Sequence, residues 1–273
     1  MSEITCRFGQ HRELSGIVSM PLGEARVGLV LVNAGFVAKA GPFRLYVEIA
    51  RHVAESGIVT LRFDLGGLGH SVRHAGNRPL GERTRSEISA AVDELCRRYP
   101  RLEHVIVGGL CSGAEDAFRY AERDARITGV VMIDPFAYRT AGWYWRHLLH
   151  RVKRRVLRAT GLYVPLVHAS PVCDYKYMER AEASRILAAM IDRGAKTHFI
   201  YTGGHRDTFN HVGQLPRMFA PLPFQGHVTM DLLPEMDHTQ LLAEDRQLVV
   251  IAITEWLAAR SIGRANRALD KSV

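Results

Sequence analysis

Cysteine is scarce in this sequence, and the four that occur follow no recognisable pattern. Disulfide frameworks and zinc modules place cysteines at short, regular spacings, whereas these stand at Cys6, Cys96, Cys111 and Cys173. The spacing excludes a disulfide-rich scaffold and predicts free thiols in a reducing cytoplasm. Long apolar runs are absent too: no stretch reaches about 18 uncharged apolar residues, so we predict no membrane span. Residues 1–13 also lack the apolar segment of a secretory signal.

Acidic residues are outnumbered, since 28 Asp and Glu stand against 36 Lys and Arg, which gives a formal charge of +8. Much of the excess lies at residues 147–158 and 260–271. A basic balance favours acidic partners or anionic surfaces and carries no information on fold. Because no zinc knuckle, helix-turn-helix or aromatic and basic platform accompanies these segments, we do not expect nucleic-acid binding.

The sequence does contain a regular alternation of apolar strands and amphipathic helices. Near-continuous apolar runs are typical of strands that are covered on both faces, and they lie at 27–33, 58–64, 104–110 and 127–134. The segments between them have helical spacing, for example at 84–98. Two shorter strands, at 5–8 and 14–20, predict an antiparallel start to the sheet. This order predicts an α/β domain with a mostly parallel sheet and helices on both faces.

The alternation is interrupted at residues 136–176. Trp143, Trp145 and several aliphatic residues alternate there with basic residues in a helix-like pattern. We interpret this segment as an insertion that lies over the strand ends as a lid, between the two parts of a core at 1–135 and 177–273. The core then continues with predicted elements at 179–193 (helix), 198–202 and 227–232 (strands) and 243–259 (helix).

The most informative stretch lies at 104–117, where an apolar strand turns on glycines into a helix. Gly109, Cys111 and Gly113 have the spacing of a nucleophile elbow, in which small residues two before and two after the nucleophile avoid clashes at a strained turn. Ser112 would have Leu110 and Ala114 at those positions, so the spacing favours Cys111. A helix N-terminus also favours a thiolate.

Two further side chains complete a candidate triad. Ligands of an open parallel sheet bind beyond the carboxyl ends of the strands, and Cys111, Asp207 and His238 each follow a predicted strand at that edge. His238 would take up and return a proton, and Asp207 would hold its tautomer. Asp134 also ends a strand, so it remains an alternative acid.

An oxyanion that forms on attack needs preorganised N–H donors. The amide of Ser112 follows the nucleophile directly, and the amide of Phe36 follows the first long core strand. We predict that these two N–H groups form the oxyanion hole.

The chain resembles the α/β-hydrolase superfamily over nearly its whole length. The landmarks of the resemblance are Asn33-Ala34-Gly35, Arg62-Phe63-Asp64 with Gly67-x-Gly69-x-Ser71, Gly109-x-Cys111-x-Gly113, Gly204-His205-Arg206-Asp207 and Asp237-His238. More narrowly, Asn33-Ala34-Gly35 followed by Gly41-Pro42-x-Arg44-Leu45-Tyr46 looks like the hydrolases associated with bacterial exosortase and exopolysaccharide loci. The resemblance implies an α/β-hydrolase fold, a helical lid and acyl chemistry without a metal or redox cofactor.

Cysteine at position 111 departs from the majority pattern of the superfamily, which has serine there. Dienelactone hydrolases and polyhydroxyalkanoate synthases use cysteine in this motif; the former hydrolyse a lactone and the latter transfer acyl groups from a coenzyme A thioester. His70 replaces the acidic residue that is usual before Ser71.

Three functions remain open from the sequence. The first is a hydrolase that cleaves an ester or thioester through an acyl-enzyme on Cys111. The second is an acyltransferase whose basic lid docks an acidic acyl carrier protein or coenzyme A, with the cations Arg146, Arg151, Lys153, Arg154, Arg155 and Arg158. The third is a binding protein on the same scaffold. The basic lid would alternatively lie on an anionic membrane.

Overall fold

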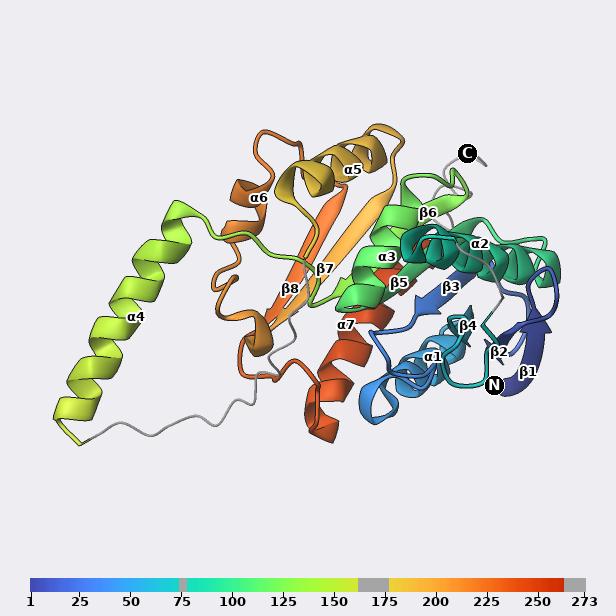
Figure 1. The fold of residues 1–273 in the computed structure, drawn as a ribbon, viewed down its shortest axis with the longest axis horizontal. Coiled ribbons are helices and arrows are strands. Elements are labelled where there is room, and N and C mark those ends of the chain that lie inside the picture. The colour runs from blue at the N-terminus through green and yellow to red at the C-terminus, as the bar shows by residue number, and fades with distance from the viewer. Residues whose placement is uncertain (74–77, 162–176, 263–273) are drawn as a thin grey trace, which may run out of the picture.

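A single sheet of eight strands organises the computed structural model, which describes residues 1–73, 78–161 and 177–262 (Figure 1). The strand order is β1-β2-β4-β3-β5-β6-β7-β8; β2 runs antiparallel to both of its neighbours, β1 and β4, and the other neighbouring pairs are parallel. The strands are β1 Ser2–Phe8, β2 Leu14–Met20, β3 Val27–Val32, β4 Ile58–Asp64, β5 His104–Leu110, β6 Ile127–Ile133, β7 Lys196–Thr202 and β8 Val228–Leu233.

Helices cover both faces of the sheet, as predicted (Figure 1). Alternate residues of a strand point to opposite faces, so Val30 of β3 joins one apolar core and Leu31 joins the other. The first core packs against α2, α3 and α5, and the second against α1 and α7. The helices are α1 Leu45–Glu55, α2 Leu80–Arg98, α3 Ser112–Ala121, α4 Ala141–Ala159, α5 Arg180–Asp192, α6 Gln214–Met218 and α7 Ala243–Ile262.

Most predicted elements lie within a few residues of their observed bounds. The helix predicted at 84–98 begins one turn earlier, at Leu80, directly after Pro79. Proline fixes its own φ and disfavours the α conformation of the residue before it, so it marks the helix start. Before α1 the chain forms a short 3-10 turn, Pro42–Arg44.

The predicted lid contains a long helix, α4, that extends away from the rest of the molecule (Figure 1). Trp143 in its first turn is its one buried residue. Residues 162–176 of the predicted insertion lie outside the described residues, as do Cys173 and most of the basic segment at 260–271. The division into a core and a lid therefore stays a prediction. Within the described ranges, no helix has both the length and the apolar character needed to cross a membrane.

Candidate active site

The turn from β5 into α3 places Cys111 in a strained backbone conformation. Its φ of 55° and ψ of −123° lie in a region that residues with a side chain rarely adopt. The chain passes very close to β3 here: a Cβ on Gly113 would stand 2.2 Å from the Asn33 carbonyl oxygen, and a Cβ on Gly109 would stand 2.9 Å from the Val32 oxygen. The two glycines are therefore needed for the turn that the sequence predicted.

His238 is held in a tight turn after β8. The Asp237 carboxylate organises this turn, because it accepts hydrogen bonds from the main-chain N–H groups of Thr239 (2.7 Å) and Leu241 (3.1 Å). On its other side His238 packs on Gly204, where an added Cβ would stand 2.4 Å from the His238 Cβ. This packing places the imidazole in the lining of the same cavity as Cys111.

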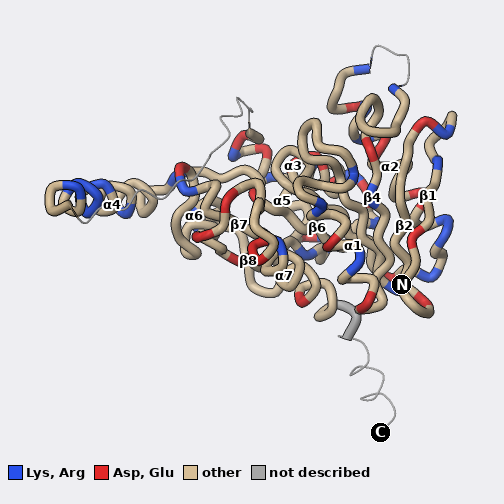
Figure 2. The backbone as a smooth tube through the Cα atoms, turned by 90° about the horizontal axis from the view of Figure 1, so that it is seen from below, with Lys and Arg blue, Asp and Glu red and all other residues tan. Residues whose placement is uncertain are grey.

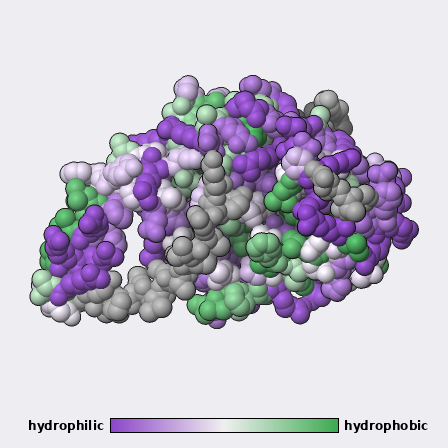
Figure 3. All heavy atoms as spheres, viewed as in Figure 1, coloured by the Kyte–Doolittle hydropathy of each residue, from purple (hydrophilic) through white to green (hydrophobic). Residues whose placement is uncertain are grey.

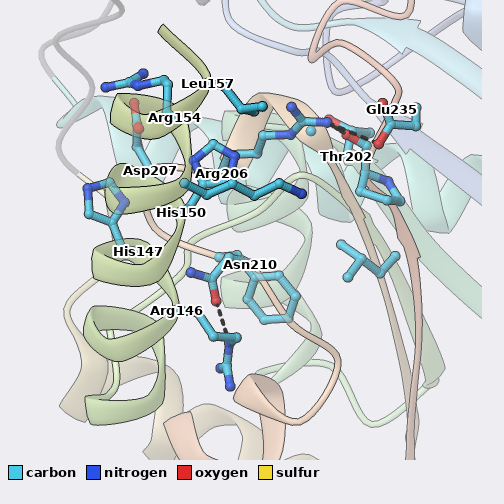
Figure 4. Close-up of a pocket in the computed structure, with 15 residues that line it drawn as sticks. Arg146, His147, His150, Arg154, Leu157, Thr202, Arg206, Asp207, Asn210 and Glu235 are labelled. Atoms are coloured by element: carbon cyan, nitrogen blue, oxygen red, sulfur yellow. Dashed lines mark hydrogen bonds and ion pairs between the residues drawn. The ribbon is translucent and has the colours of Figure 1, made fainter. Parts of the chain in front are cut away.

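The carboxylate beside His238 is Asp134, not Asp207. The His238 Nδ1 donates a hydrogen bond of 2.8 Å to the Asp134 Oδ2, and the Asp134 side chain is fully buried. Asp134 directly follows β6, the neighbour of β5 in the sheet. Asp207 instead lines a separate cavity of about 660 Å³ with α4 (Figure 4). The expectation that Asp207 pairs with His238 is therefore wrong, and the alternative, Asp134, occupies that position.

Thr202, which the sequence reasoning missed, fixes the Asp134 carboxylate, and His205, which the sequence analysis named only within a motif, holds the Asp134 main chain. The Thr202 main-chain N–H donates to Asp134 Oδ1 (2.7 Å), and its hydroxyl donates to Oδ2 (2.5 Å). The His205 Nε2 donates to the Asp134 carbonyl oxygen at 3.1 Å. Thr202 ends β7, directly beside β6, so its place at the same sheet edge was the available signal. Burial lowers the pKa of His205, which keeps that ring neutral.

The pKa of His238 is raised from 6.5 to about 10. Burial alone would lower it, but the hydrogen bond to Asp134 and the interaction with Cys111 stabilise the charged ring and outweigh burial. The imidazole is therefore protonated at neutral pH in this arrangement.

A cavity of about 470 Å³ opens at Cys111 and His238. Phe36 and Ser112, the residues whose amides we predicted as oxyanion donors, both line it. Ser112 is the first residue of α3, and the first N–H groups of a helix have no partner within the helix. The remaining lining is mostly apolar and consists of Ala34, Gly35, Val37, Pro42, Leu110 and Thr239.

The loop that carries Phe36 is tied to the nucleophile turn and to β4. The Gly35 N–H donates to the Ser112 hydroxyl at 2.8 Å, so the hydroxyl of Ser112 serves this loop. Asn33 spans the base of the loop, because its side-chain amide donates to the Val37 carbonyl oxygen at 2.7 Å. The Lys39 N–H donates to the buried Asp64 carboxylate at 2.6 Å, and the two side chains form an ion pair. These contacts preorganise the loop.

Among the described residues, one group offers three metal-ligand atoms within 4.8 Å of one another: Asp134, His205 and His238. The Asp134 Oδ2 and the His238 Nδ1 hydrogen-bond to each other. The His205 Nε2 hydrogen-bonds to the Asp134 main chain. These contacts orient the His238 ring and stabilise its charged form.

A match to one family model shows which protein family the chain belongs to. Residues 25–198, which include Cys111 and Asp134, match the model of the family described as serine aminopeptidase, S33. The chain belongs to this family. His238 lies beyond the matched region. Among curated proteins, the search found no match in sequence.

Solved structures with the same fold cover nearly the whole chain of this S33 family member. An α/β hydrolase of unknown function from Agrobacterium tumefaciens is 15% identical, with a TM-score of 0.62 over 96% of this chain and 97% of its own. An esterase from Pyrococcus furiosus is 14% identical, with a TM-score of 0.60 over 96% and 91%. A serine hydrolase without a lid from Xanthomonas campestris is 14% identical, with a TM-score of 0.54 over 95% and 94%. The predicted α/β-hydrolase fold is confirmed.

Membership of the S33 family makes the protein a hydrolase of the α/β-hydrolase fold. The family is described by its serine enzymes, whereas the residue at the strained turn of this chain is Cys111. The comparisons do not test the narrower resemblance to exosortase-associated hydrolases, which stays a prediction.

Proposed function

We propose that this protein hydrolyses esters or thioesters through a covalent acyl-enzyme on Cys111. The observation that carries the proposal is the arrangement at the cavity: Cys111 and His238 line it together, and His238 hydrogen-bonds to the buried Asp134. A nucleophile, a proton carrier and a group that orients the carrier form the minimum set for acyl transfer.

In the first half-reaction, the Cys111 Sγ attacks the carbonyl carbon of the substrate, and the carbonyl electron pair moves onto oxygen. The N–H groups of Phe36 and Ser112 donate to this oxyanion. When the tetrahedral intermediate collapses, the bond to the leaving group breaks and His238 gives its proton to the leaving alkoxide or thiolate. The products are an alcohol or thiol and a thioester on Cys111.

In the second half-reaction, a water molecule attacks the Cys111 thioester. His238, now neutral, takes a proton from this water, and the second tetrahedral intermediate collapses to a carboxylic acid and the Cys111 thiolate. Asp134 stabilises the imidazolium that forms in this step. His238 is then protonated again, as the raised pKa of its resting state requires.

The proposal is tested by intact-mass measurement after mixing with 4-nitrophenyl and thioester acyl donors. We expect an acyl adduct in the wild type, mapped to the peptide of Cys111, and none in Cys111→Ala. Cys96→Ala is the matched control because Cys96 is another half-buried free cysteine, and burial raises the pKa of its thiol. Ser112→Ala is expected to keep the adduct, since its main-chain N–H remains. An adduct in Cys111→Ala that disappears in Ser112→Ala would assign the nucleophile to serine.

The second candidate is an acyltransferase that uses the same acyl-enzyme. It is favoured by the second cavity, into which His147, Lys153 and Arg154 of α4 and Arg206 after β7 bring basic groups (Figure 4). Such groups suit the phosphates of coenzyme A or an acidic carrier protein. Discharge of the adduct by water supports the hydrolase; discharge only by an added alcohol or amine supports transfer. If no donor gives an adduct, the result favours the third function, a binding protein on this scaffold.

A further inference from the structure

We propose that the outward face of α4 docks the protein on a bilayer surface rich in anionic phospholipid. The face consists of Trp145, Leu148, Leu149, Val152 and Val156, here called the apolar stripe, and exposed arginines lie along its edge. The proposal concerns where the protein binds and does not depend on the reaction at Cys111.

The apolar stripe is exposed although its composition is that of a buried surface. Its five residues are each between 51% and 63% exposed, and their spacing of three and four places them on one side of a helix with about 3.6 residues per turn. Tyr144 at the edge of the stripe is 58% exposed as well. An apolar patch of this kind on a monomer marks an interaction surface.

The first turns of α4 attach the helix to the body and thereby set which side faces outward. The Trp143 Nε1 donates to the Arg206 carbonyl oxygen at 3.3 Å, and the Arg146 Nε donates to the Asn210 side chain at 3.1 Å. His147, His150 and Arg154 then line the cavity between α4 and the body. Helical periodicity places these three residues opposite the apolar stripe, so the stripe points away from the body.

The charge of α4 favours an anionic partner. Residues 141–159 contain six Lys and Arg and no Asp or Glu, and Figure 2 shows the blue cationic positions along the projecting helix. Figure 3 shows hydrophobic side chains beside hydrophilic ones on the same helix. Arg151 and Arg155 are exposed, and helical periodicity places both along one edge of the stripe. Long arginine side chains keep their charge at the headgroups while their stems contact apolar surface.

These features together match a helix that lies in a membrane interface. Such helices combine an apolar face that contains Trp and Leu with a Lys- and Arg-rich polar face, and they bind anionic lipid more tightly than neutral lipid. A second copy of this chain fits the stripe less well, because two α4 helices packed together would bring twelve like charges close to one another (six from each copy) with no acid on either helix.

The test is co-sedimentation of the full chain with vesicles of phosphatidylcholine mixed with phosphatidylglycerol, and with vesicles of phosphatidylcholine alone, at low and high salt. We expect binding to the mixed vesicles at low salt, weaker binding at high salt, and little binding to phosphatidylcholine. Brominated lipid should quench the fluorescence of Trp145, and the quenching should disappear in Trp145→Phe. Absence of binding to the mixed vesicles at low salt overturns the proposal.

The apolar stripe is tested by Trp145→Ser/Leu149→Ser, which we expect to bind at least about 100-fold more weakly because two large apolar side chains no longer enter the interface. Leu22→Ser is the matched control, since Leu22 is 88% exposed but lies in the β2–β3 turn. Far-ultraviolet circular dichroism and the melting temperature show that each variant is folded. Binding that is equal in the stripe variant and the control would contradict the assignment.

The charges are tested by Arg151→Gln/Arg155→Gln, which we expect to bind about 30-fold more weakly to the mixed vesicles. Arg12→Gln/Arg123→Gln removes the same charge at exposed positions outside α4 and should bind like the wild type. Light scattering checks the competing occupant: a dimer that dissociates in Trp145→Ser/Leu149→Ser would assign the stripe to self-association. Binding to an acidic carrier protein that needs the stripe, without vesicle binding, would assign it to that protein instead.

Discussion

One carboxylate, that of Asp134, accepts hydrogen bonds from the His238 ring and from both the main chain and the hydroxyl of Thr202. We expect Asp134→Asn to lower kcat/KM on the order of 10³- to 10⁴-fold, because an amide stabilises neither the required tautomer nor the imidazolium. Asp207→Asn is the control and should stay close to the wild type. Steady-state kinetics with a 4-nitrophenyl ester measure both; an equal loss in Asp207→Asn would restore Asp207 as the acid.

The raised pKa of His238 makes a second prediction at the residue scale. Because the folded state holds this proton more tightly than the unfolded chain, His238 adds stability that is complete below about pH 6.5 and is lost as the pH rises through about 10. The free energy of unfolding in urea should therefore fall more steeply between neutral and alkaline pH in the wild type than in His238→Asn. Parallel curves for the two proteins would show that the ring is not charged in the fold.

At the scale of elements, the sequence predicted the strands and helices but not their neighbours in space. The apolar run and the glycine spacing located Cys111 because both signals are local. The choice between Asp134 and Asp207 depends on strand order: β6 lies beside β5, and the three-residue turn after β7 carries Asp207 past the sheet edge toward α4. The sequence did not predict the position of α4 either, because Trp143 is its one buried residue.

The close approach of α3 to β3 predicts an element-scale effect of one methyl group. In Gly113→Ala the new Cβ would stand within 2.6 Å of two main-chain oxygens, those of Asn33 and Val32. Either α3 or the loop that carries Phe36 must therefore move. We expect a loss of several kcal/mol of stability, or a folded protein with little activity. Gly81→Ala in α2 is the control, since among the described residues its Cβ would have one contact, at 3.6 Å, and alanine favours a helix by about 1 kcal/mol. Urea unfolding and ester hydrolysis report both effects, and a Gly113→Ala variant that matches Gly81→Ala in both would contradict the close approach.

At the scale of the whole molecule, the candidate site exists only when the sheet is complete. Cys111 follows β5 in the middle of the sheet and His238 follows β8 at its edge, and the family match ends before β8 begins. Residues that act as one unit have strongly non-additive effects on rate. We therefore expect Cys111→Ala, His238→Ala and the double variant to lose similar activity, each on the order of 10⁴-fold or more in kcat. Single-turnover kinetics with an activated ester measure the three rates on protein whose fold is checked by circular dichroism. Losses that multiply in the double variant would mean that the thiol and the imidazole act independently, and the proposed acyl-enzyme mechanism would then be wrong.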